Sequence, residues 1–367
     1  NINKKSMRLL IVTQKVDIND PTLGFFHCWV EEFAKHFETI TVICLQKGEY
    51  NLPENVRIIS LGKEKLTANS HQSPAFSYKL SALRKVKYIL KFYKYIIRER
   101  KNYDSVFVHM NQEYILLGGI FWRLFGKKIY IWRNHHSGSF LTDIVSIFCS
   151  KVFCTSKYSY TAKYKKTVLM PVGVDASKFV NLEISKVQKI KNSILFLGRI
   201  APSKNVDVFI EALGLLKKQG VNFTANVYGD ALPADTYYLE GLKKRAQELD
   251  LAVNLKFYKG PVYPATEIYN SHEIFVNLSS SGMYDKTIFE AMACGCLVLA
   301  SNDNLRGQIN DDFIFKQGNL LEFSEKLEKL LNYSDAGRQN FSQQLQEFAK
   351  KHSLKFLAEK LFFNMLE

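Results

Sequence analysis

Short apolar runs alternate with amphipathic stretches along the whole chain. Runs such as residues 9–12 and 194–197 are continuously apolar, which is typical of strands buried on both faces. They predict strands at residues 7–13, 40–45, 56–60, 105–110, 128–133, 151–155 and 167–170, and then at 193–198, 223–229, 254–258, 273–278, 297–300 and 312–315. Amphipathic spacing predicts helices at residues 24–38, 77–101, 204–219, 235–250 and 285–294.

The alternation of strands and helices predicts parallel sheets with right-handed crossovers. Two such series indicate an α/β protein with two doubly wound, Rossmann-like domains, which we place at residues 7–180 and 181–345. The region around the boundary, 176–191, is a charged stretch followed by a fresh strand. Residues 331–367 predict two helices with no strand after them.

Composition narrows the class of protein. The chain has 367 residues, of which 47% are hydrophobic and 23% charged, so disordered and fibrous classes are excluded. No apolar run reaches the roughly 18–20 residues of a membrane span, and no secretory leader is visible, so we expect Met7 to be the natural start and the protein to be cytoplasmic. The six cysteines form no CxxC pair, and we expect free thiols and no zinc site.

The net charge of +15 is confined to the first half of the chain. Residues 1–180 hold 28 basic and 13 acidic residues, which leaves 22 of each in the remainder. An anionic partner of the first half is therefore expected: a lipid surface, a phosphorylated substrate or a nucleic acid.

Two cations follow a strand of the second domain. The strand at 193–198 ends at Gly198, Arg199 comes next, and Lys204 stands where a helix begins after Ser203. Ligands of open α/β sheets bind beyond the carboxyl ends of the strands, and cations at a helix N-terminus suit a diphosphate. Surface ion pairs of Arg199 and Lys204 are an equally weighted alternative.

A Ser/Gly loop connects the strand at 273–278 to the helix at 285–294. Its small residues, 279–282, let backbone N–H groups approach a phosphate or a sugar hydroxyl. Glu290 lies in a mostly apolar stretch of the helix, so its carboxylate needs a partner. A ribose diol or a structural salt bridge would each supply one.

Two further strand ends lie in the first domain. A long loop follows the first strand, and Gly24 then opens a helix; the loop lacks GxGxxG, which disfavours NAD and FAD. The strand at 128–133 ends before His135 and His136, which would point into the same crevice, although a surface or core histidine is the more common case.

The stretch 77–101 carries nine basic residues and one acid. Leucine, valine, tyrosine and isoleucine recur in it at helical spacing, so we expect one face to pack on the domain and the other to be strongly cationic. The apolar positions are Leu80, Leu83, Val86, Leu90, Tyr93 and Ile97, and the predicted membrane-facing cations are Lys79, Arg84, Lys85, Lys87, Lys91, Lys94 and Arg98. An anionic bilayer suits this face; a solvated face or a nucleic acid is the alternative, but no nucleic-acid-binding motif accompanies it.

Taken together, the motifs resemble those of the retaining family 4 glycosyltransferases of the GT-B fold. The resemblance covers the chain from Met7 onward and rests on the order and spacing of the following motifs: the Gly24 loop, the strand-end histidine, 171–175 with Phe179, Gly198-Arg199 with Lys204, 228–230, and 290–295. It implies two Rossmann-like domains facing a cleft, with the acceptor on the N-terminal domain and a nucleotide-sugar on the C-terminal one. It also implies that the last segment, residues 346–367, packs back on the N-terminal domain.

The resemblance assigns roles to individual residues. Arg199 and Lys204 match the pair that binds the donor diphosphate, Glu290 the residue that holds the ribose, and His136, or else His135, the acceptor-domain histidine near the transferred sugar. The implied donor-binding set is Gly24, Gly198, Arg199, Lys204, Gly229, Gly282, Met283, Tyr284, Asp285 and Glu290; the acceptor-side set is Phe25, Arg133, His135 and His136; His136, Arg199 and Lys204 are the catalytic candidates. One departure is clear: the first glutamate of the family's E-x7-E falls at Gly282.

The expected activity is transfer of a sugar, with retention, from a UDP- or GDP-linked donor to a hydroxyl of a glycan or lipid-linked acceptor. The nucleotide-sugar is a substrate, and no metal or other cofactor is expected. The predicted location is the cytoplasmic face of a membrane, to which the protein binds peripherally. Gly282 motivates one alternative, a non-catalytic nucleotide-sugar-binding or membrane-docked partner protein; a nucleotide-sugar epimerase and a nucleic-acid-binding protein are the others.

Overall fold

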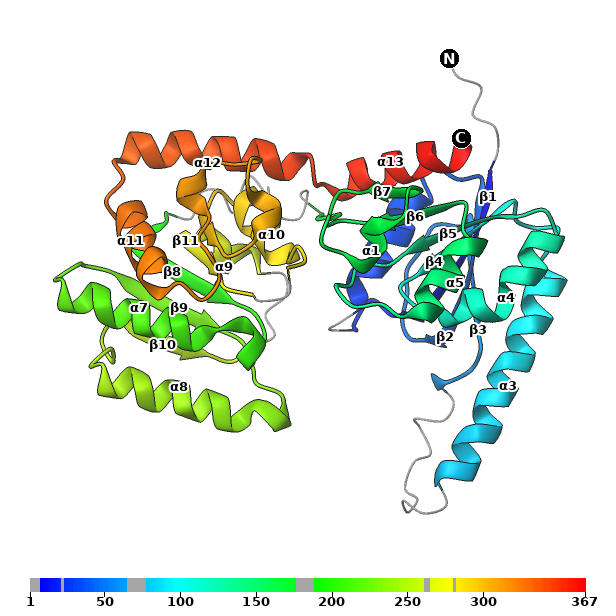
Figure 1. Cartoon of the computed structure of the whole chain (residues 1–367), viewed down its shortest axis with the longest axis horizontal. Coiled ribbons are helices and arrows are strands. Elements are labelled where there is room, and N and C mark those ends of the chain that lie inside the picture. Colours follow the sequence, from blue (N-terminus) through cyan, green and yellow to red (C-terminus); the bar gives the residue numbers. More distant parts are fainter. Residues whose placement is uncertain (1–6, 21–22, 65–76, 176–187, 261–264, 280–281) are drawn as a thin grey trace. The chain divides into compact units, whose positions relative to one another are not determined.

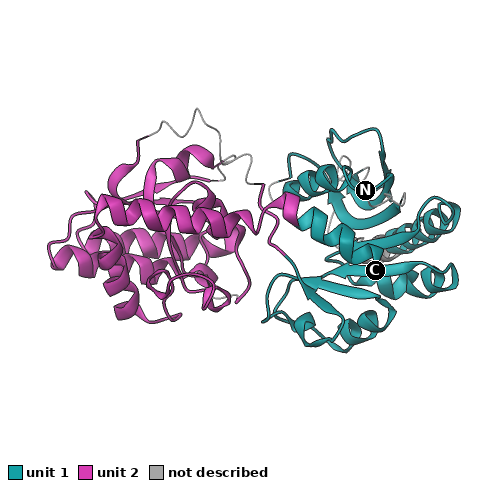
Figure 2. Ribbon diagram, turned by 90° about the horizontal axis from the view of Figure 1, so that it is seen from above, with its two compact units in different colours: residues 1–170, 357–367 teal, residues 171–356 magenta. Residues whose placement is uncertain are grey.

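The chain folds into two compact α/β units. The computed structural model describes residues 7–367 except 21–22, 65–76, 176–187, 261–264 and 280–281, and within the helix that follows residue 76 it describes the side chains from Leu83 onward. The first unit comprises Asn1–Met170 together with Leu357–Glu367, and the second Pro171–Phe356 (Figure 2). The boundaries predicted from sequence were 180/181 and 345/346; most of the residues between 170 and 187 lie outside the described part of the chain.

The first unit is built on a seven-stranded parallel sheet with the order β3-β2-β1-β4-β5-β6-β7 (Figure 1). Its strands are β1 (Arg8–Val16), β2 (Thr39–Lys47), β3 (Val56–Ser60), β4 (Ser105–His109), β5 (Lys128–Trp132), β6 (Lys151–Cys154) and β7 (Thr167–Leu169). Its helices are α1 (Gly24–Phe33), α3 (Ser77–Arg98), α4 (Glu113–Leu124), α5 (Phe140–Phe148) and α13 (Leu354–Leu366), which begins in the second unit. The inner strands β2, β1, β4, β5 and β6 are buried along most of their length, as coverage on both faces requires, whereas the edge strands β3 and β7 are only partly buried.

The second unit has a five-stranded parallel sheet with the order β10-β9-β8-β11-β12. Its strands are β8 (Ile190–Leu197), β9 (Thr224–Tyr228), β10 (Leu255–Tyr258), β11 (His272–Asn277) and β12 (Leu297–Ala300). Its helices are α7 (Val206–Lys218), α8 (Thr236–Glu248), α9 (Thr266–Asn270), α10 (Lys286–Ala293), α11 (Leu320–Leu331) and α12 (Asp335–Lys350). The order reverses direction between β8 and β11, so the carboxyl ends of these two strands define the switch point where ligands of such sheets bind.

The prediction of two doubly wound parallel-sheet domains is confirmed. The strand predicted at 312–315 is wrong: Asp311–Phe313 form a 3-10 turn, and Ile314 makes only an isolated bridge to Ala300. Three aspartates and asparagines cluster at the start of this segment, and side chains of this type favour turns over strands.

The prediction for the packing face of α3 is also wrong. Leu83 and Leu90 are 69% and 64% exposed, and Val86 and Ile97 are exposed as well. The helix contacts its unit through Phe92 and Ile96, which belong to the same buried cluster as Trp122 of α4. Helix α3 therefore has two apolar stripes, and hydrophobic spacing alone does not reveal which of them the fold covers.

The last helix, α13, packs against the first unit. The Tyr130 hydroxyl of β5 donates a hydrogen bond of 3.1 Å to the carbonyl of Met365. The ring of Phe362 meets that of Phe37 edge-on, with 5.1 Å between centroids. None of the described helices is long and apolar enough to span a membrane.

Candidate functional site

Glycines line the carboxyl edge of the second unit's sheet. Gly198, Gly229 and Gly260 follow the adjacent strands β8, β9 and β10. A Cβ on Gly229 would lie 1.9 Å from the carbonyl oxygen of Gly198, and one on Gly260 would lie 3.0 Å from the Cα of Gly229. The three backbones therefore approach one another closely, and the three glycines present main chain and no side chains at this edge.

Lys204 is held at this edge by polar groups of the neighbouring strand end. Its ammonium lies 2.7 Å from Asp285 Oδ2 and 3.2 Å from Ser279 Oγ. Asn277, the last residue of β11, donates to the same Asp285 oxygen at 3.0 Å. Lys204 therefore forms an ion pair with Asp285, and this pair lies at the switch point of the sheet.

Arg199 differs from Lys204 in its surroundings. It is exposed, directly after Gly198, and within the described part of the chain no ion pair involves its guanidinium. The corner that carries both cations is fixed by Asn205, which adopts a left-handed backbone (φ 48°) and donates from Nδ2 to the carbonyl of Leu278 at 2.7 Å.

The loop before α10 is held by two asparagines. Gly282 has φ +66°, in the region that favours glycine. Its carbonyl accepts a hydrogen bond of 2.8 Å from Asn304 Nδ2, and the carbonyl of Met283 accepts one of 2.8 Å from Asn302 Nδ2. The Tyr284 hydroxyl in turn donates to the Asn304 carbonyl at 3.0 Å.

The sequence analysis missed both asparagines. Asn302 and Asn304 are buried and follow the carboxyl end of β12. Their position directly after a predicted strand could have marked them as candidate site residues.

Glu290 of α10 accepts a hydrogen bond of 3.1 Å from the hydroxyl of the buried Tyr269. Burial raises the pKa of Glu290, and it raises that of Tyr269 well above its ordinary value. The alternative of a structural salt bridge finds no support among the described ion pairs, because the partner is a neutral hydroxyl. A desolvated carboxylate with one neutral donor can accept further hydrogen bonds from ligand hydroxyls.

In the first unit, Gly24 begins α1 as predicted. A Cβ at this position would lie 3.0 Å from the carbonyl oxygen of Ile18, so the loop after β1 approaches the helix start closely. Phe25 meets His109 edge-on at 6.0 Å, and Phe26 stacks on the same imidazole at 3.9 Å. The buried Thr13 of β1 also contacts His109, with 3.3 Å between Thr13 Oγ1 and His109 Nδ1.

Sequence reasoning missed this cluster around His109. Both Thr13 and His109 belong to the carboxyl halves of their strands. This position, at the same edge of the sheet as the Gly24 loop, could have marked them as candidate site residues.

His135 and His136 are both exposed, with their rings stacked at 4.6 Å. The loop that carries them is anchored by two buried hydroxyls: Thr161 Oγ1 donates to the carbonyl of Arg133 at 2.9 Å, and Ser159 Oγ donates to the carbonyl of His135 at 3.2 Å. A guanidinium N–H of Arg133 donates to the carbonyl of Ser137 at 3.2 Å.

The predicted membrane-facing cations fall into three groups. Arg84, Lys85, Lys87 and Lys94 are exposed on α3, and so is Arg98, which is paired with Glu99. Lys91 is half-buried and donates to the carbonyl of Leu61 at 2.9 Å, so it belongs to the packed side. The side chain of Lys79 lies outside the described residues.

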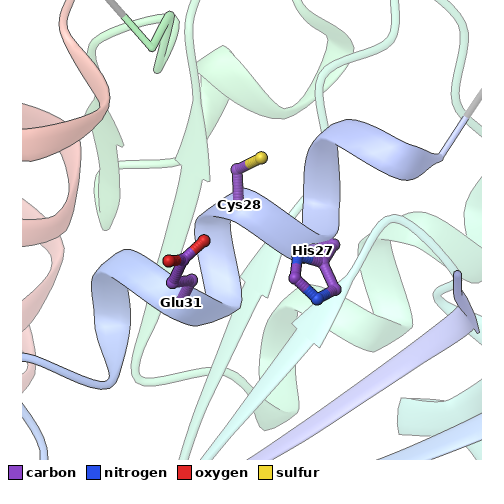
Figure 3. Close-up of side chains that lie close together, drawn as sticks. All are labelled: His27, Cys28 and Glu31. Carbon is purple, nitrogen blue, oxygen red and sulfur yellow. The ribbon is translucent and has the colours of Figure 1, made fainter. Parts of the chain in front are cut away.

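One group of metal-ligand types lies on α1. Ligand atoms of His27, Cys28 and Glu31 lie within 4.8 Å of one another. Figure 3 shows the imidazole and the thiol pointing in different directions from the helix. Since Nε2 of His27 already accepts a hydrogen bond from the Asn51 amide, we assign this group no role.

The second unit is similar in sequence to known proteins. Residues 178–352 match the family model described as "Glycosyl transferases group 1". Digalactosyldiacylglycerol synthase 2 of Arabidopsis thaliana is 26% identical over 166 residues, 43% of this chain. The GtfA subunit of the UDP-N-acetylglucosamine–peptide N-acetylglucosaminyltransferase of Streptococcus parasanguinis is 26% identical over 178 residues, 46% of this chain. The matched segment covers 33% of the length of each relative.

Solved structures resemble the whole chain. HepE of Anabaena in complex with UDP superposes with a TM-score of 0.75 at 16% identity, over 98% of this chain and 100% of that one. WaaG, a glycosyltransferase involved in lipopolysaccharide biosynthesis, gives 0.63 at 17% identity, over 96% and 98%. The fold is GT-B. Within this GT-B chain, the segment that matches the family model coincides with nearly all of the second unit, which carries Arg199, Lys204 and Glu290.

Proposed function

We propose that this protein is a retaining, metal-independent glycosyltransferase. It takes a sugar from a UDP- or GDP-linked donor and transfers it to a hydroxyl of a glycan or lipid-linked acceptor at the cytoplasmic face of a membrane. The observation that carries the proposal is the position of Lys204 at the switch point of a sheet whose unit matches group 1 glycosyltransferases. The related proteins that are named for UDP-linked substrates or UDP complexes support this donor class.

Each donor-side residue has a chemical task in this proposal. Lys204 and Arg199 bind the diphosphate and neutralise the charge that develops as the nucleoside diphosphate leaves. Glu290 accepts hydrogen bonds from the ribose hydroxyls. Main-chain groups of Gly198, Gly229 and residues 282–285 allow close approach of the donor, since no Cβ is in the way at the glycines.

The acceptor-side residues of the proposal belong to the first unit. Gly24, Phe25, Arg133, His135 and His136 all follow carboxyl ends of its strands. Retention follows from attack on the donor face from which the phosphate departs, with the leaving phosphate accepting the proton of the acceptor hydroxyl.

The decisive experiment is a thermal-shift panel of nucleotide-sugars, nucleoside diphosphates and monophosphates. A ligand at 100-fold its dissociation constant adds about 2.7 kcal/mol of stability, which is easily seen. We expect stabilisation by one nucleoside diphosphate and its sugar conjugates, and loss of it in Arg199→Ala and Lys204→Ala. Lys218→Ala, an exposed lysine of α7, is the control. Full donor binding by both site variants would refute the diphosphate assignment.

Gly282 favours one second candidate, a non-catalytic nucleotide-sugar-binding protein. In that case the donor binds and no sugar is transferred or hydrolysed, whatever acceptor is offered. An epimerase would convert the donor without an acceptor. Product analysis by mass spectrometry and by NMR of the sugar ring separates these outcomes.

Membrane binding is the last element of the proposal, and α3 supports it. Its exposed apolar residues Leu83, Val86 and Leu90 lie next to exposed cations of the same helix. Apolar side chains beside cations suit the interface of an anionic bilayer, where each basic residue contributes about 1 kcal/mol.

Vesicle sedimentation tests this part separately. We expect binding to phosphatidylglycerol-containing vesicles and weak binding to pure phosphatidylcholine. The variant Leu83→Ser/Leu90→Ser should lose binding while nucleotide affinity stays unchanged. Binding of nucleic acid in place of vesicles, with steep salt dependence, would contradict the membrane assignment.

A further inference from the structure

Asp285 occupies a helix N-cap position without capping the helix. It directly precedes α10, yet its side chain makes no capping hydrogen bond. Its Oδ2 accepts instead from the ammonium of Lys204 at 2.7 Å and from Asn277 Nδ2 at 3.0 Å. Aspartate is among the preferred N-cap residues, so a second position of low energy, on the first-turn amides of α10, lies within reach of this carboxylate.

The contacts with Asp285 and Ser279 occupy most of the hydrogen-bonding capacity of the Lys204 ammonium. An ammonium has three N–H donors, and here one points at Asp285 and one at Ser279 Oγ, 3.2 Å away. The side chains of Lys204 and Asp285 are 22% and 24% exposed, so solvent screens the pair only in part. An anion that approaches this lysine therefore meets a carboxylate already bound to it.

We propose that Asp285 is an internal counterion of Lys204 that the diphosphate of the donor must displace, so that Asp285 sets the affinity of the site for the donor and for the leaving nucleoside diphosphate. The inference rests on the proposed function, because it takes Lys204 as the diphosphate ligand. Diphosphate oxygens replace the carboxylate on Lys204, and the carboxylate moves to the N-terminus of α10, where the helix dipole favours it. A counterion of this kind weakens product binding as well, and so speeds release of the nucleoside diphosphate.

The direction of the effect separates this role from a purely structural one. If Asp285 competes with the ligand, its removal strengthens binding, because repulsion between two anions is lost and the ammonium is freed. If Asp285 only supports the loop, or holds Lys204 in its binding position, its removal weakens binding. No gain of affinity is expected from a structural residue.

Isothermal titration calorimetry with UDP and GDP tests the proposal without an acceptor. We expect Asp285→Asn and Asp285→Ser, which can still cap α10, to bind the preferred nucleoside diphosphate about three- to fivefold more tightly than the wild type. The control is Asp250→Asn, which removes a carboxylate from another lysine pair of the same unit, that with Lys217 at 2.7 Å. It should leave affinity within about twofold. Lys204→Met should weaken binding.

The outcomes are distinguishable. Unchanged or weaker binding in both Asp285 variants overturns the counterion role, and so does a failure of both to fold, since Asp285 would then be structural. If the wild type binds neither UDP nor GDP nor any nucleotide-sugar, the proposed function itself fails first. An equal gain in Asp250→Asn would show a general charge effect and would also overturn the role of Asp285.

Discussion

Gly229 shows how tightly main-chain packing constrains the candidate site. A Cβ at this residue would lie 1.9 Å from the carbonyl oxygen of Gly198, a backbone atom that moves only with its strand. We expect Gly229→Ala to reduce the free energy of unfolding by about 2–4 kcal/mol, as overpacking and strain do, and to weaken nucleotide binding. Urea unfolding and calorimetry measure the two effects.

Gly241→Ala is the matched control for that substitution. Gly241 lies inside α8, and a Cβ there meets nothing within 4 Å. Alanine is the better helix former by about 1 kcal/mol, so this variant should be more stable than the wild type. A loss of stability in both variants would show that the close approach at Gly229 is not the cause.

Glu290 makes the stability of the fold depend on pH, and the burial of its carboxyl determines the direction of this dependence. Burial raises the pKa of its carboxyl above the ordinary value of 4.5. Below that value the carboxyl is protonated in the folded and unfolded states and contributes nothing. As pH rises toward the folded-state pKa, the unfolded state ionises first and the folded state loses stability.

Glu290→Gln removes this penalty. The stability difference between variant and wild type should be near zero at pH 4 and should grow in favour of the variant up to pH 7. Thermal unfolding across this range measures it, with Glu325→Gln, an exposed residue of α11, as the control. A difference that does not depend on pH would contradict the assignment.

At the scale of elements, Lys189 links the ends of two helices. Its ammonium donates to the carbonyls of Tyr269, His272 and Cys294 at 3.3, 2.7 and 3.3 Å. The carbonyls of Tyr269 and Cys294 lie at the C-terminal ends of α9 and α10, where a cation is favourable, and His272 begins β11. Lys189→Met should therefore cost about 1–3 kcal/mol of unfolding free energy. Lys191→Met, at an exposed position of β8, should cost little; equal losses would refute the capping role.

The elements could be predicted because burial on both faces leaves a clear apolar signal. All the named strands of the described chain coincide with predicted runs, within a few residues at each end. Helix α4 was missed because its mostly apolar sequence has a weak polar face, and the short helices α5 and α9 and helix α11 were missed as well. The positions of Arg199 and Lys204 after β8, and of Glu290 in the helix that follows β11, were predicted from the same alternation.

Contacts between residues distant in sequence could not be predicted in this way. Nothing in the sequence pairs Lys204 with Asp285, 81 positions later, or Asn304 with the Gly282 carbonyl. The exposed stripe of α3 was assigned to the wrong side for the same reason, because the choice between Leu83–Leu90 and Phe92–Ile96 depends on which surface α4 offers.

At the scale of the whole molecule, the chain leaves its first unit after Met170 and returns to it at Leu357. The returning segment of α13 is held by Phe362, which is 8% exposed and packs on Phe37 with 5.1 Å between ring centroids. Its neighbour Phe363 is 56% exposed. The two adjacent phenylalanines therefore form a matched pair in which only one side chain contributes to the core.

We expect Phe362→Ala to destabilise the first unit by about 3–5 kcal/mol, since a buried ring is lost, whereas Phe363→Ala should change stability by less than about 1 kcal/mol. Hydrogen exchange resolved by peptide measures each unit separately. Protection should fall in β1, β4 and β5 of the Phe362 variant, while β8, β9 and β11 of the second unit keep theirs and the nucleotide still binds. If protection fell equally in both units, the two would unfold as one cooperative body, and the return of α13 would stabilise the whole chain rather than the unit it joins.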